Sequence, residues 1–560
     1  MALIKGSLAK FPPAAGQATA SVQDSTPAMA TAPVSVPKKS MFSIMKPDLS
    51  APVPRSAPSI ALPSLTYSDE QNSIIHCDGS VIVANAYAGT GKTSMLRGYT
   101  EHRPSVRFLY AAFSKALQLE AEGKFGRNTL CKTTHSLAWP IGKLYQDAGK
   151  LRPSIKPLDI TDRYPQIAYV DARRIVDTIT AFFASTDEQI NENHLPIDVT
   201  VPIARSRVIE AATKVWAQMI DLKDPMPIVH DGYLKLYAMS KPDLSTRFDT
   251  ILFDEAQDAN PVTSQIILSQ KKCKVLVVGD RYQSIFGFRG AENAMETVQD
   301  SAENIFYLTR SFRFGKGIAD LASNLLADFR GATKPLVGLG HCQDTRFKVD
   351  HSKQHAILSR TNGGVFRTAV DCVMKEVPFS LITGVDNYQF NKILDTFNLH
   401  EGASDKIRDN FIRRFPSFME ASEYAEEVED KELSSMIKIV EEYRSDIPGL
   451  IEEIKKRSIS DREAKEKAIV QITTAHRSKG LEFDQVVIND DYPELMDGEN
   501  GLPMVPESRE DREEIHLAYV ATTRAREAIQ LNPQLQAWVD WREGSGLNKT
   551  AEKKPVAMEM

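Results

Sequence analysis

The chain has 560 residues, of which 42% are hydrophobic and 25% are charged, with a formal net charge of −6 at pH 7. This composition predicts a soluble protein with large buried cores and more than one domain. No apolar run approaches the roughly 18 residues of a membrane-spanning helix, and the N-terminus lacks the compact apolar core of a secretory signal. We therefore expect no membrane partner and a cytoplasmic location. The acidic balance excludes a uniformly basic surface, although local basic grooves remain compatible with it.

The two ends of the chain and its cysteines carry little folding information. Residues 1–62 are rich in Ala, Pro and Ser and are predicted to be a disordered tail, as are residues 541–560. Within the first tail, Met41–Met45 is either a short docking motif for a protein partner or a chance apolar cluster. The five cysteines lie far apart without a CxxC pair, which indicates reduced thiols rather than a zinc site or a disulfide framework.

Between the tails, short apolar runs typical of buried strands alternate with helical stretches, which predicts parallel α/β sheets. The predicted strands are Val81–Val83, Phe108–Phe113, Ile251–Phe253, Val275–Val278, Ile305–Leu308, Ala356–Leu358, Ile469–Thr473 and Val486–Ile488. Two long, mostly helical stretches interrupt this pattern, at residues 137–247 and 387–467. We therefore expect two α/β lobes, each carrying a helical insert.

The first predicted strand runs into a glycine-rich loop. Residues 86–93 read Ala-Tyr-Ala-Gly-Thr-Gly-Lys-Thr. Such a loop turns backbone N–H groups toward phosphate oxygens, with Lys92 reaching the β- and γ-phosphates and Thr93 placing its hydroxyl on Mg²⁺. The phosphate-binding residues would be Ala88, Gly89, Thr90, Gly91, Lys92 and Thr93. Seen alone, the loop is also compatible with a plain glycine-rich turn before a helix.

A second predicted strand ends in two adjacent carboxylates, Asp254 and Glu255. Parallel sheets present ligands at the carboxyl ends of their strands. Asp254 is suited to hold Mg²⁺, and Glu255 is suited to accept a proton from an attacking water. A solvated acidic pair at a strand end is the alternative, and the phosphate loop upstream favours a nucleoside triphosphatase that uses ATP and Mg²⁺.

Together with the glycine-rich loop and the acidic pair, five further segments stand in an order that resembles the superfamily 1 DNA helicases of the UvrD/Rep/PcrA type. These segments are Tyr67–Gln71, Val278–Ala291, Leu308–Arg313, Thr474–Phe483 and Leu517–Ala525. Three further segments are similar to the F-box DNA helicase branch and its prokaryotic or viral relatives: Tyr110–Lys115, Cys131–Ser136 and Ser311–Gly315. Only the motor of that branch is evident in the sequence, and no F-box is. The resemblance spans about residues 65–535.

The resemblance implies two RecA-like lobes with two mostly helical inserts. The first lobe would comprise residues 63–136 and 248–300, with its insert at 137–247. The second would comprise residues 301–386 and 468–540, with a short insert at 387–467.

The resemblance also implies roles at the nucleotide. Gln71 would read the adenine edge, Phe312 would stack on the base and Glu482 would bind the ribose. Gln283 would sense the γ-phosphate, while Arg313 and Arg524 would stabilise charge on the transferring phosphoryl group. Together with Lys92, Asp254 and Glu255, the last three complete the expected catalytic set.

A separate set of residues is implied to contact single-stranded DNA. Aromatic rings grip unpaired bases with little sequence preference because every base has a π-face. The expected contacts are Phe113, Thr134, His135, Phe286, Phe288, Arg289 and His476. Without the resemblance, Phe286 and Phe288 would be assigned to a hydrophobic core.

These expectations describe an ATP-dependent DNA helicase that moves 3′ to 5′ on single strands, acts at junctions with duplex as a monomer, and works in the DNA-containing compartment in repair, recombination or replication. One alternative is a remodeller that strips proteins from DNA with weak unwinding, which the short second insert favours. The other is a recruitment platform docked through the N-terminal tail.

Overall fold

The computed structural model describes residues 65–196, 198–287, 293–299, 302–340, 349–409, 411–427, 430–460 and 467–545. Met41–Met45, Phe288 and Arg289 lie outside these residues. None of the described helices is long and apolar enough to span a lipid bilayer.

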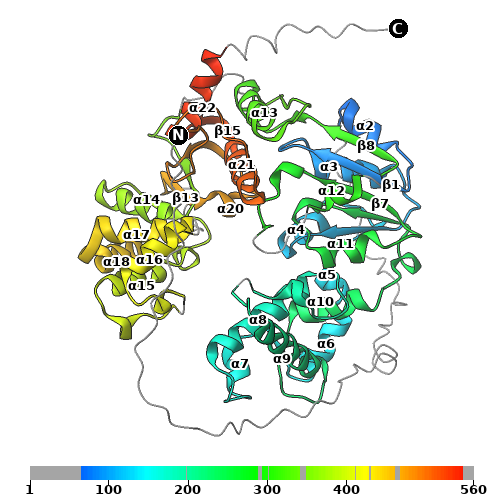
Figure 1. Ribbon diagram of the computed structural model, residues 1–560. Coiled ribbons are helices and arrows are strands. Elements are labelled where there is room, and N and C mark those ends of the chain that lie inside the picture. The colour runs from blue at the N-terminus through cyan, green and yellow to red at the C-terminus, as the bar shows by residue number, and fades with distance from the viewer. Residues whose placement is uncertain are drawn as a thin grey trace, which may run out of the picture. The chain divides into compact units, whose positions relative to one another are not determined.

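The first lobe is built on a six-stranded parallel sheet with the strand order β3-β2-β6-β7-β1-β8 (Figure 1). Its strands are β1 (Val81–Ala86), β2 (Phe108–Ala112), β3 (Thr129–Thr133), β6 (Thr250–Phe253), β7 (Lys274–Gly279) and β8 (Asn304–Leu308). Its helices are α2 (Asp69–Ile75), α3 (Lys92–Glu101), α4 (Lys115–Glu122), α5 (Thr134–Leu137), α11 (Pro261–Leu268) and α12 (Ala294–Gln299). Side chains of α2 and α3 pack with one face of the central strands in a shared apolar core.

The boundary expected at residue 300 differs from the observed one. β8 pairs in parallel with β1, with Ile305 opposite Val83 and Leu308 opposite Ala86. The first sheet therefore extends to Leu308, because the backbone of this run pairs with β1 as the edge strand of that sheet.

The second lobe holds a five-stranded parallel sheet with the order β12-β13-β11-β14-β15. Its strands are β11 (His355–Ser359), β12 (Phe379–Leu381), β13 (Val470–Thr474), β14 (Phe483–Ile488) and β15 (Ala525–Gln530). Its helices are α13 (Lys316–Arg330), α14 (Asn362–Met374), α20 (Ala475–Ser478), α21 (Arg509–Thr522) and α22 (Pro533–Gly544), so the last helix continues past the expected boundary at residue 540. Two short strands, β9 (Arg310–Ser311) and β10 (Val337–Gly338), pair in parallel. β9 follows β8, and β10 follows α13.

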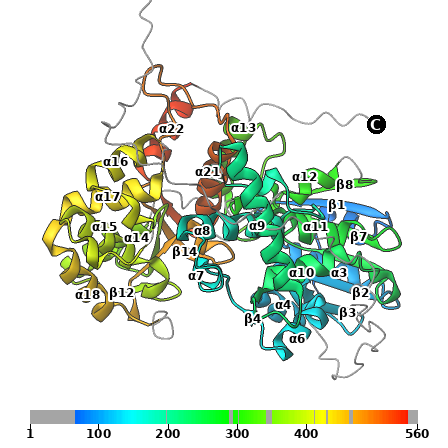
Figure 2. The same ribbon diagram turned by 60° about the horizontal axis from the view of Figure 1, so that its bottom comes forward.

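The two inserts are helical, apart from a short pair formed by β4 (Leu151–Arg152) and β5 (Ile228–Val229). The first contains α6 (Trp139–Asp147), α7 (Pro157–Thr161), α8 (Tyr169–Ala184), α9 (Pro202–Ile220) and α10 (His230–Met239). The second contains α15 (Phe390–His400), α16 (Phe418–Glu427), α17 (Lys431–Tyr443) and α18 (Ile447–Arg457), which gather beside α14 in both ribbon views (Figure 1 and Figure 2). The prediction of two parallel α/β lobes with helical inserts is confirmed.

The second insert shares one core with the lobe that carries it. Ile437 of α17 and Ile451 of α18 belong to the same buried cluster as Phe366 of α14 and Ile472 of β13. Because a contiguous core behaves as one packed body, this insert is an extension of the second lobe rather than a separate domain.

Candidate active site

The glycine-rich loop joins β1 to α3 as predicted. Gly89 and Gly91 adopt φ angles of 73° and 76°, a region that L side chains rarely enter. A Cβ on Gly89 would lie 2.4 Å from Ser311 Oγ, and one on Gly91 would lie 2.8 Å from Gln71 Nε2. Both glycines are therefore required by conformation and by close approach. Thr90 Oγ1 closes the turn by donating to the carbonyl of Tyr87 at 2.8 Å.

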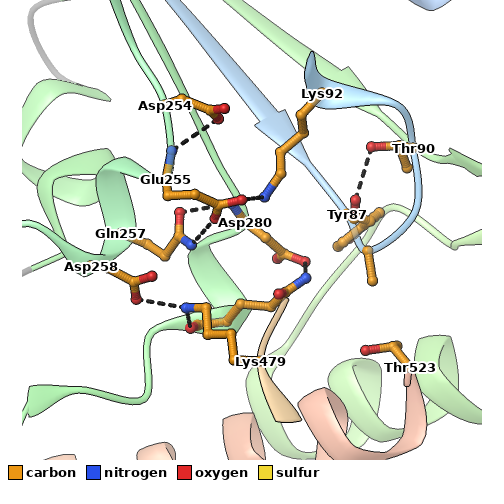
Figure 3. A network of polar contacts seen from close by, with 12 residues as sticks. Tyr87, Thr90, Lys92, Asp254, Glu255, Gln257, Asp258, Asp280, Lys479 and Thr523 are labelled. Atoms are coloured by element: carbon orange, nitrogen blue, oxygen red, sulfur yellow. Dashed lines mark hydrogen bonds and ion pairs between the residues drawn. The ribbon is translucent and has the colours of Figure 1, made fainter. Parts of the chain in front are cut away.

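Lys92 begins α3 and forms an ion pair with Glu255, with Nζ 2.7 Å from Oε1. Figure 3 shows the two side chains pointing toward one another from the loop and from the end of β6. Burial alone would lower the pKa of Lys92, yet Glu255, Asp254 and Asp280 together raise it above its usual value. The lysine is therefore fully charged, as its predicted phosphate-binding role requires.

The pKa values of the two carboxylates at the end of β6 are shifted in opposite directions. Burial and the neighbouring Glu255 raise the pKa of Asp254, whose oxygens accept from the Tyr110 hydroxyl at 2.7 Å and the Glu255 N–H at 2.9 Å. Burial also acts to raise the pKa of Glu255, but Lys92 and Lys479 outweigh it and lower that pKa below its usual range. Glu255 is therefore the ionised member that can accept a hydrogen bond or a proton.

The backbone at Glu255 is strained. Its φ of 52° and ψ of 40° lie in the left-handed region, which costs an L residue about 1–2 kcal/mol. This turn leaves the strand so that the carboxylate of Glu255 faces Lys92 and accepts from Gln257 Nε2 at 2.5 Å. Such strain concentrates at functional sites, where packing over-determines the conformation.

A lysine of the second lobe reaches the first lobe beside this pair. Lys479, which follows α20, places Nζ 2.6 Å from Asp258 Oδ1 and also donates to the carbonyl of Gln283 (Figure 3). Burial raises the pKa of Asp258 to about 6 despite the lysine and with the help of Glu255. The contact links the end of β6 and the turn after β7 to the second lobe.

Tyr519 of α21 makes a second connection between the lobes. Its hydroxyl accepts from the N–H of Ala88 at 3.2 Å and donates to Asp280 Oδ2 at 2.9 Å. Gln283, the predicted γ-phosphate sensor, donates from Nε2 to the same Asp280 oxygen at 2.7 Å. The phosphate loop, the turn after β7 and α21 therefore share one buried polar network.

The two predicted arginines lie together in the second lobe. Arg313 pairs with Glu482, at 2.6 Å, and donates to the carbonyl of Thr523 at 2.9 Å. Arg524 is fully buried and donates to the carbonyls of Val520 and Leu481 at 3.0 and 3.3 Å. Burial and the neighbouring Arg313 lower the pKa of Arg524 to about 9. Glu482, the predicted ribose ligand, is thus the partner of Arg313 here.

The predicted base-binding residues flank Gly91. Gln71 donates from Nε2 to the carbonyl of Thr90 at 3.1 Å, and its Oε1 accepts from the N–H of Ser68 in a capping box at the start of α2. Phe312 is half exposed, and its N–H donates to the carbonyl of Gly89 at 2.9 Å. A Cβ on Gly91 would lie 3.8 Å from the Phe312 ring, so the amide and the ring border the same loop. Thr93 is partly buried at the start of α3.

The predicted DNA contacts fall into three groups. Phe113 and Phe286 have parallel rings, with centroids 6.4 Å apart and an interplanar angle of 12°, and Phe113 is 43% exposed. Thr134 is buried 3.4 Å from the Thr263 hydroxyl, while His135 lies 3.0 Å from Asp231 of the first insert. His476 is partly buried on α20.

Several residues in this network carry no role in the sequence prediction. Tyr110, Asp258, Lys479 and Tyr519 all lie within or next to the segments that carried the resemblance, but no spacing indicates that they meet. Tyr110 is separated from Asp254 by the whole first insert. The adjacency of β2 and β6 in the sheet brings these two residues together.

Two family models match parts of the chain. Residues 232–302 match the UvrD/REP helicase N-terminal domain, and residues 273–532 match the UvrD-like helicase C-terminal domain. F-box DNA helicase 1 of Gallus gallus is 35% identical over 516 residues, covering 85% of this chain and 50% of the relative. F-box DNA helicase protein 1 of Schizosaccharomyces pombe is 29% identical over 511 residues, covering 83% and 57%, respectively.

A bacterial relative matches over a smaller region. DNA helicase II of Escherichia coli is 24% identical over 300 residues, covering 47% of this chain and 41% of the relative. The chain spans about half the length of the F-box relatives that it matches. With its paired parallel sheets, its phosphate loop and both helicase domains, the chain belongs to the UvrD-like DNA helicase family.

Proposed function

We propose that this protein is an ATP-dependent motor that moves on single-stranded DNA, with ATP bound where Lys92, Asp254 and Glu255 meet. The observation that carries the proposal is the Lys92–Glu255 pair at 2.7 Å, placed between two conformationally required glycines and a buried carboxylate. A cation held by a carboxylate at a phosphate loop is poised to exchange that partner for a phosphate.

The site also suits Mg²⁺. Thr93 and Asp254 would hold the ion, since Mg²⁺ in such sites takes one or two protein ligands and completes its shell with water and phosphate oxygens. When bound, the ion would neutralise charge on the phosphates. Tyr110 and the Glu255 N–H already fix the orientation of the Asp254 carboxylate.

Each lobe would contribute to hydrolysis. Glu255 would orient the attacking water and accept its proton once Lys92 turns to phosphate. Arg313 and Arg524 from the second lobe would stabilise charge on the transferring group, after Arg313 releases Glu482. Lys479 and Tyr519 would report the state of this site between the lobes, because each belongs to the second lobe and bonds residues of the first.

Translocation would follow from alternating grip. The parallel rings of Phe113 and Phe286 offer a stacking platform, and Lys479 lies 5.2 Å from the Phe286 ring centroid. One side chain thus touches both the nucleotide-side carboxylate Asp258 and a proposed DNA-side ring. We propose 3′-to-5′ movement on single strands and at junctions, in the DNA-containing compartment.

The first experiment is steady-state ATPase activity with and without single-stranded DNA. We expect strong stimulation by DNA and loss of turnover in Lys92→Ala. A tailed duplex then tests direction: unwinding of the 3′-tailed substrate is expected, and preference for the 5′ tail would contradict the proposed polarity. ATPase activity that ignores DNA would contradict the motor itself.

A protein-stripping remodeller is the second candidate. The observation that favours it is the second insert, whose helices continue the core of their own lobe. Such an insert is not free to swing onto a duplex. A strand-displacement assay beside a protein-displacement assay separates the two functions, and a pull-down with residues 1–62 removed tests recruitment through the tail.

A further inference from the structure

A polar cavity lies behind the phosphate loop, away from the predicted nucleotide contacts. It has a volume of about 160 Å³ and is lined by the end of β1, the turn after β7, Tyr307 of β8 and the C-terminal end of α13. A single water needs roughly 10–15 Å³ of such space, so the cavity has room for a small hydrated ion.

The cavity opens on the side of the first sheet that faces away from α3. Ala84, Ala86 and Phe306 pack with α3 in one core. Side chains alternate along a strand, so Asn85 and its register partner Tyr307 project to the other face. The backbone of β1 and the phosphate loop therefore separates this cavity from the α3 side.

The charged groups that line the cavity are mostly cationic. Arg281, Arg330 and Lys334 contribute three positive charges, and Asp280 is the single carboxylate among the lining residues. Asp280 already accepts from Gln283 Nε2, the Tyr519 hydroxyl and the Tyr282 N–H, at 2.7, 2.9 and 3.1 Å. The Asp280 oxygens therefore already accept hydrogen bonds from these three donors rather than from the cations of the cavity.

The cations have few acidic partners among the described residues. Arg330 donates from Nε to His516 Nε2 at 3.0 Å, and burial and the neighbouring Arg512 lower its pKa. Arg281 approaches one carboxylate, Glu296, at 3.6 Å, and Lys334 lies 5.7 Å over the Tyr307 ring with no ion pair in the described part of the chain. The cluster thus carries uncompensated positive charge.

Two buried donors at the cavity also lack acceptors within the described residues. Asn85 is 7% exposed, and its Nδ2 has no hydrogen-bond partner. The Nε atom of Arg281 is also buried and has no hydrogen-bond partner. A buried donor without an acceptor is destabilising, so an acceptor in the cavity would be favoured. An ion with several oxygens satisfies amide and guanidinium donors together.

We propose that this cavity is a binding site for a tetrahedral oxyanion of the phosphate class, held by Arg281, Arg330, Lys334 and the amide of Asn85. The site joins the two lobes. Arg330 is the last residue of α13 and Lys334 follows that helix, whereas Asn85 lies in β1 and Arg281 lies in the turn after β7. The Tyr87 hydroxyl already donates to the Lys334 carbonyl at 2.7 Å, so bound phosphate would brace the start of the phosphate loop.

The test is calorimetric titration of the full chain with inorganic phosphate, in the presence of saturating Mg²⁺ and a non-hydrolysable ATP analogue. The analogue blocks phosphate binding at Lys92. We expect one phosphate per chain, bound at least tenfold more weakly by the Arg281→Ala/Lys334→Ala double variant. Lys316→Ala, which removes a lysine from the opposite end of α13, is the matched control and should bind as the wild type does.

Each outcome decides the proposal. Absence of phosphate binding, or equal binding by the wild type and the double variant, overturns it. Displacement of phosphate by a single-stranded oligonucleotide would assign the cavity to DNA backbone phosphate and also overturn it. If the double variant does not fold, Lys334→Ala alone serves, because that side chain is exposed and the Tyr87 bond uses the main chain. Failure of the analogue to bind contradicts the proposed ATP site, while the comparison with the double variant still tests the cavity.

Discussion

The phosphate end of the site and its proposed DNA face are organised in opposite ways. At the phosphate end, Lys92, Glu255, Asp258 and Lys479 form short ion pairs in buried surroundings. At the DNA face, Phe113 stands 43% exposed beside the half-buried Phe286. Buried charges are costly unless paired, so the first region is held fixed by its own partners, whereas the exposed ring of Phe113 is held less tightly and is open to a ligand.

This difference predicts unequal sensitivity to substitution. The buried pairs should behave as a unit in which one loss disables the chemistry, and the exposed rings should contribute separately to affinity. The following variants test that contrast in order of expected effect.

Glu255→Gln should give the largest loss. The amide keeps size and hydrogen bonding but cannot accept the proton, so turnover should fall by about 10²–10⁴-fold. Nucleotide should still bind, because Lys92 is then free to meet phosphate. Single-turnover hydrolysis measured beside nucleotide affinity checks both points, and near-normal turnover would show that the base is another group.

Lys479→Met should remove the link between the phosphate end of the site and the proposed DNA face. Leaving Asp258 buried without its cation costs about 3–5 kcal/mol, which is measured as lost stability to urea. The ratio of DNA-stimulated to basal ATPase should fall as well. The double variant with Asp258→Asn should recover stability but not stimulation. Recovery of both would show that the pair is only structural.

Phe113→Ala should weaken single-strand binding by about 1–3 kcal/mol, the usual cost of losing one base stack, while melting temperature stays close to that of the wild type. Leu119→Ala, another exposed apolar residue of the first lobe, serves as the control. A fall in melting temperature with DNA affinity preserved would place Phe113 in the packing of the lobe instead.

Near neutral pH, His516 should contribute the smallest effect, and it offers a pH test. Burial lowers its pKa from 6.5 to about 3, and its ring accepts from Arg330 and bonds the Ser284 carbonyl at 3.0 Å. The unfolded chain takes up a proton that the folded chain refuses, so stability is lost as pH falls from about 6.5 toward 3, by roughly 1.4 kcal/mol per pH unit. Urea midpoints at pH 8, 6 and 5 should lie closer together in His516→Gln than in the wild type, whereas His351→Gln should leave their spread unchanged.

The sequence predicted the strands that carry the site because each is a short apolar run followed by its functional group. All eight predicted strands overlap observed ones, and their ends differ by at most 3 residues, for example Val275–Val278 within Lys274–Gly279. The sequence did not indicate β3, β12 or β15, whose runs are short or interrupted by polar residues. Phe288, assigned to the DNA face, lies outside the described residues.

The sequence identified residues of the proposed nucleotide site more readily than it identified the contacts between them. Lys92, Asp254 and Glu255 could be assigned from local pattern, and they do meet. The pairing of Arg313 with Glu482 and the contacts of Lys479 and Tyr519 depend on how the second lobe meets the first. Periodicity in the sequence reports local burial and carries no information about such tertiary pairing.

The path of the chain out of the first sheet has a mechanical consequence. β8 is the edge strand beside β1, and a few residues later Phe312 bonds the carbonyl of Gly89. The covalent crossing between lobes is thus pinned to the phosphate loop, which makes it a pivot. Displacement in a rotation grows with distance from the pivot, so opening the lobes would barely move the ring of Phe312 relative to the loop. A nucleotide base stacked on Phe312 would then stay in place while parts of the second lobe farther from this pivot move.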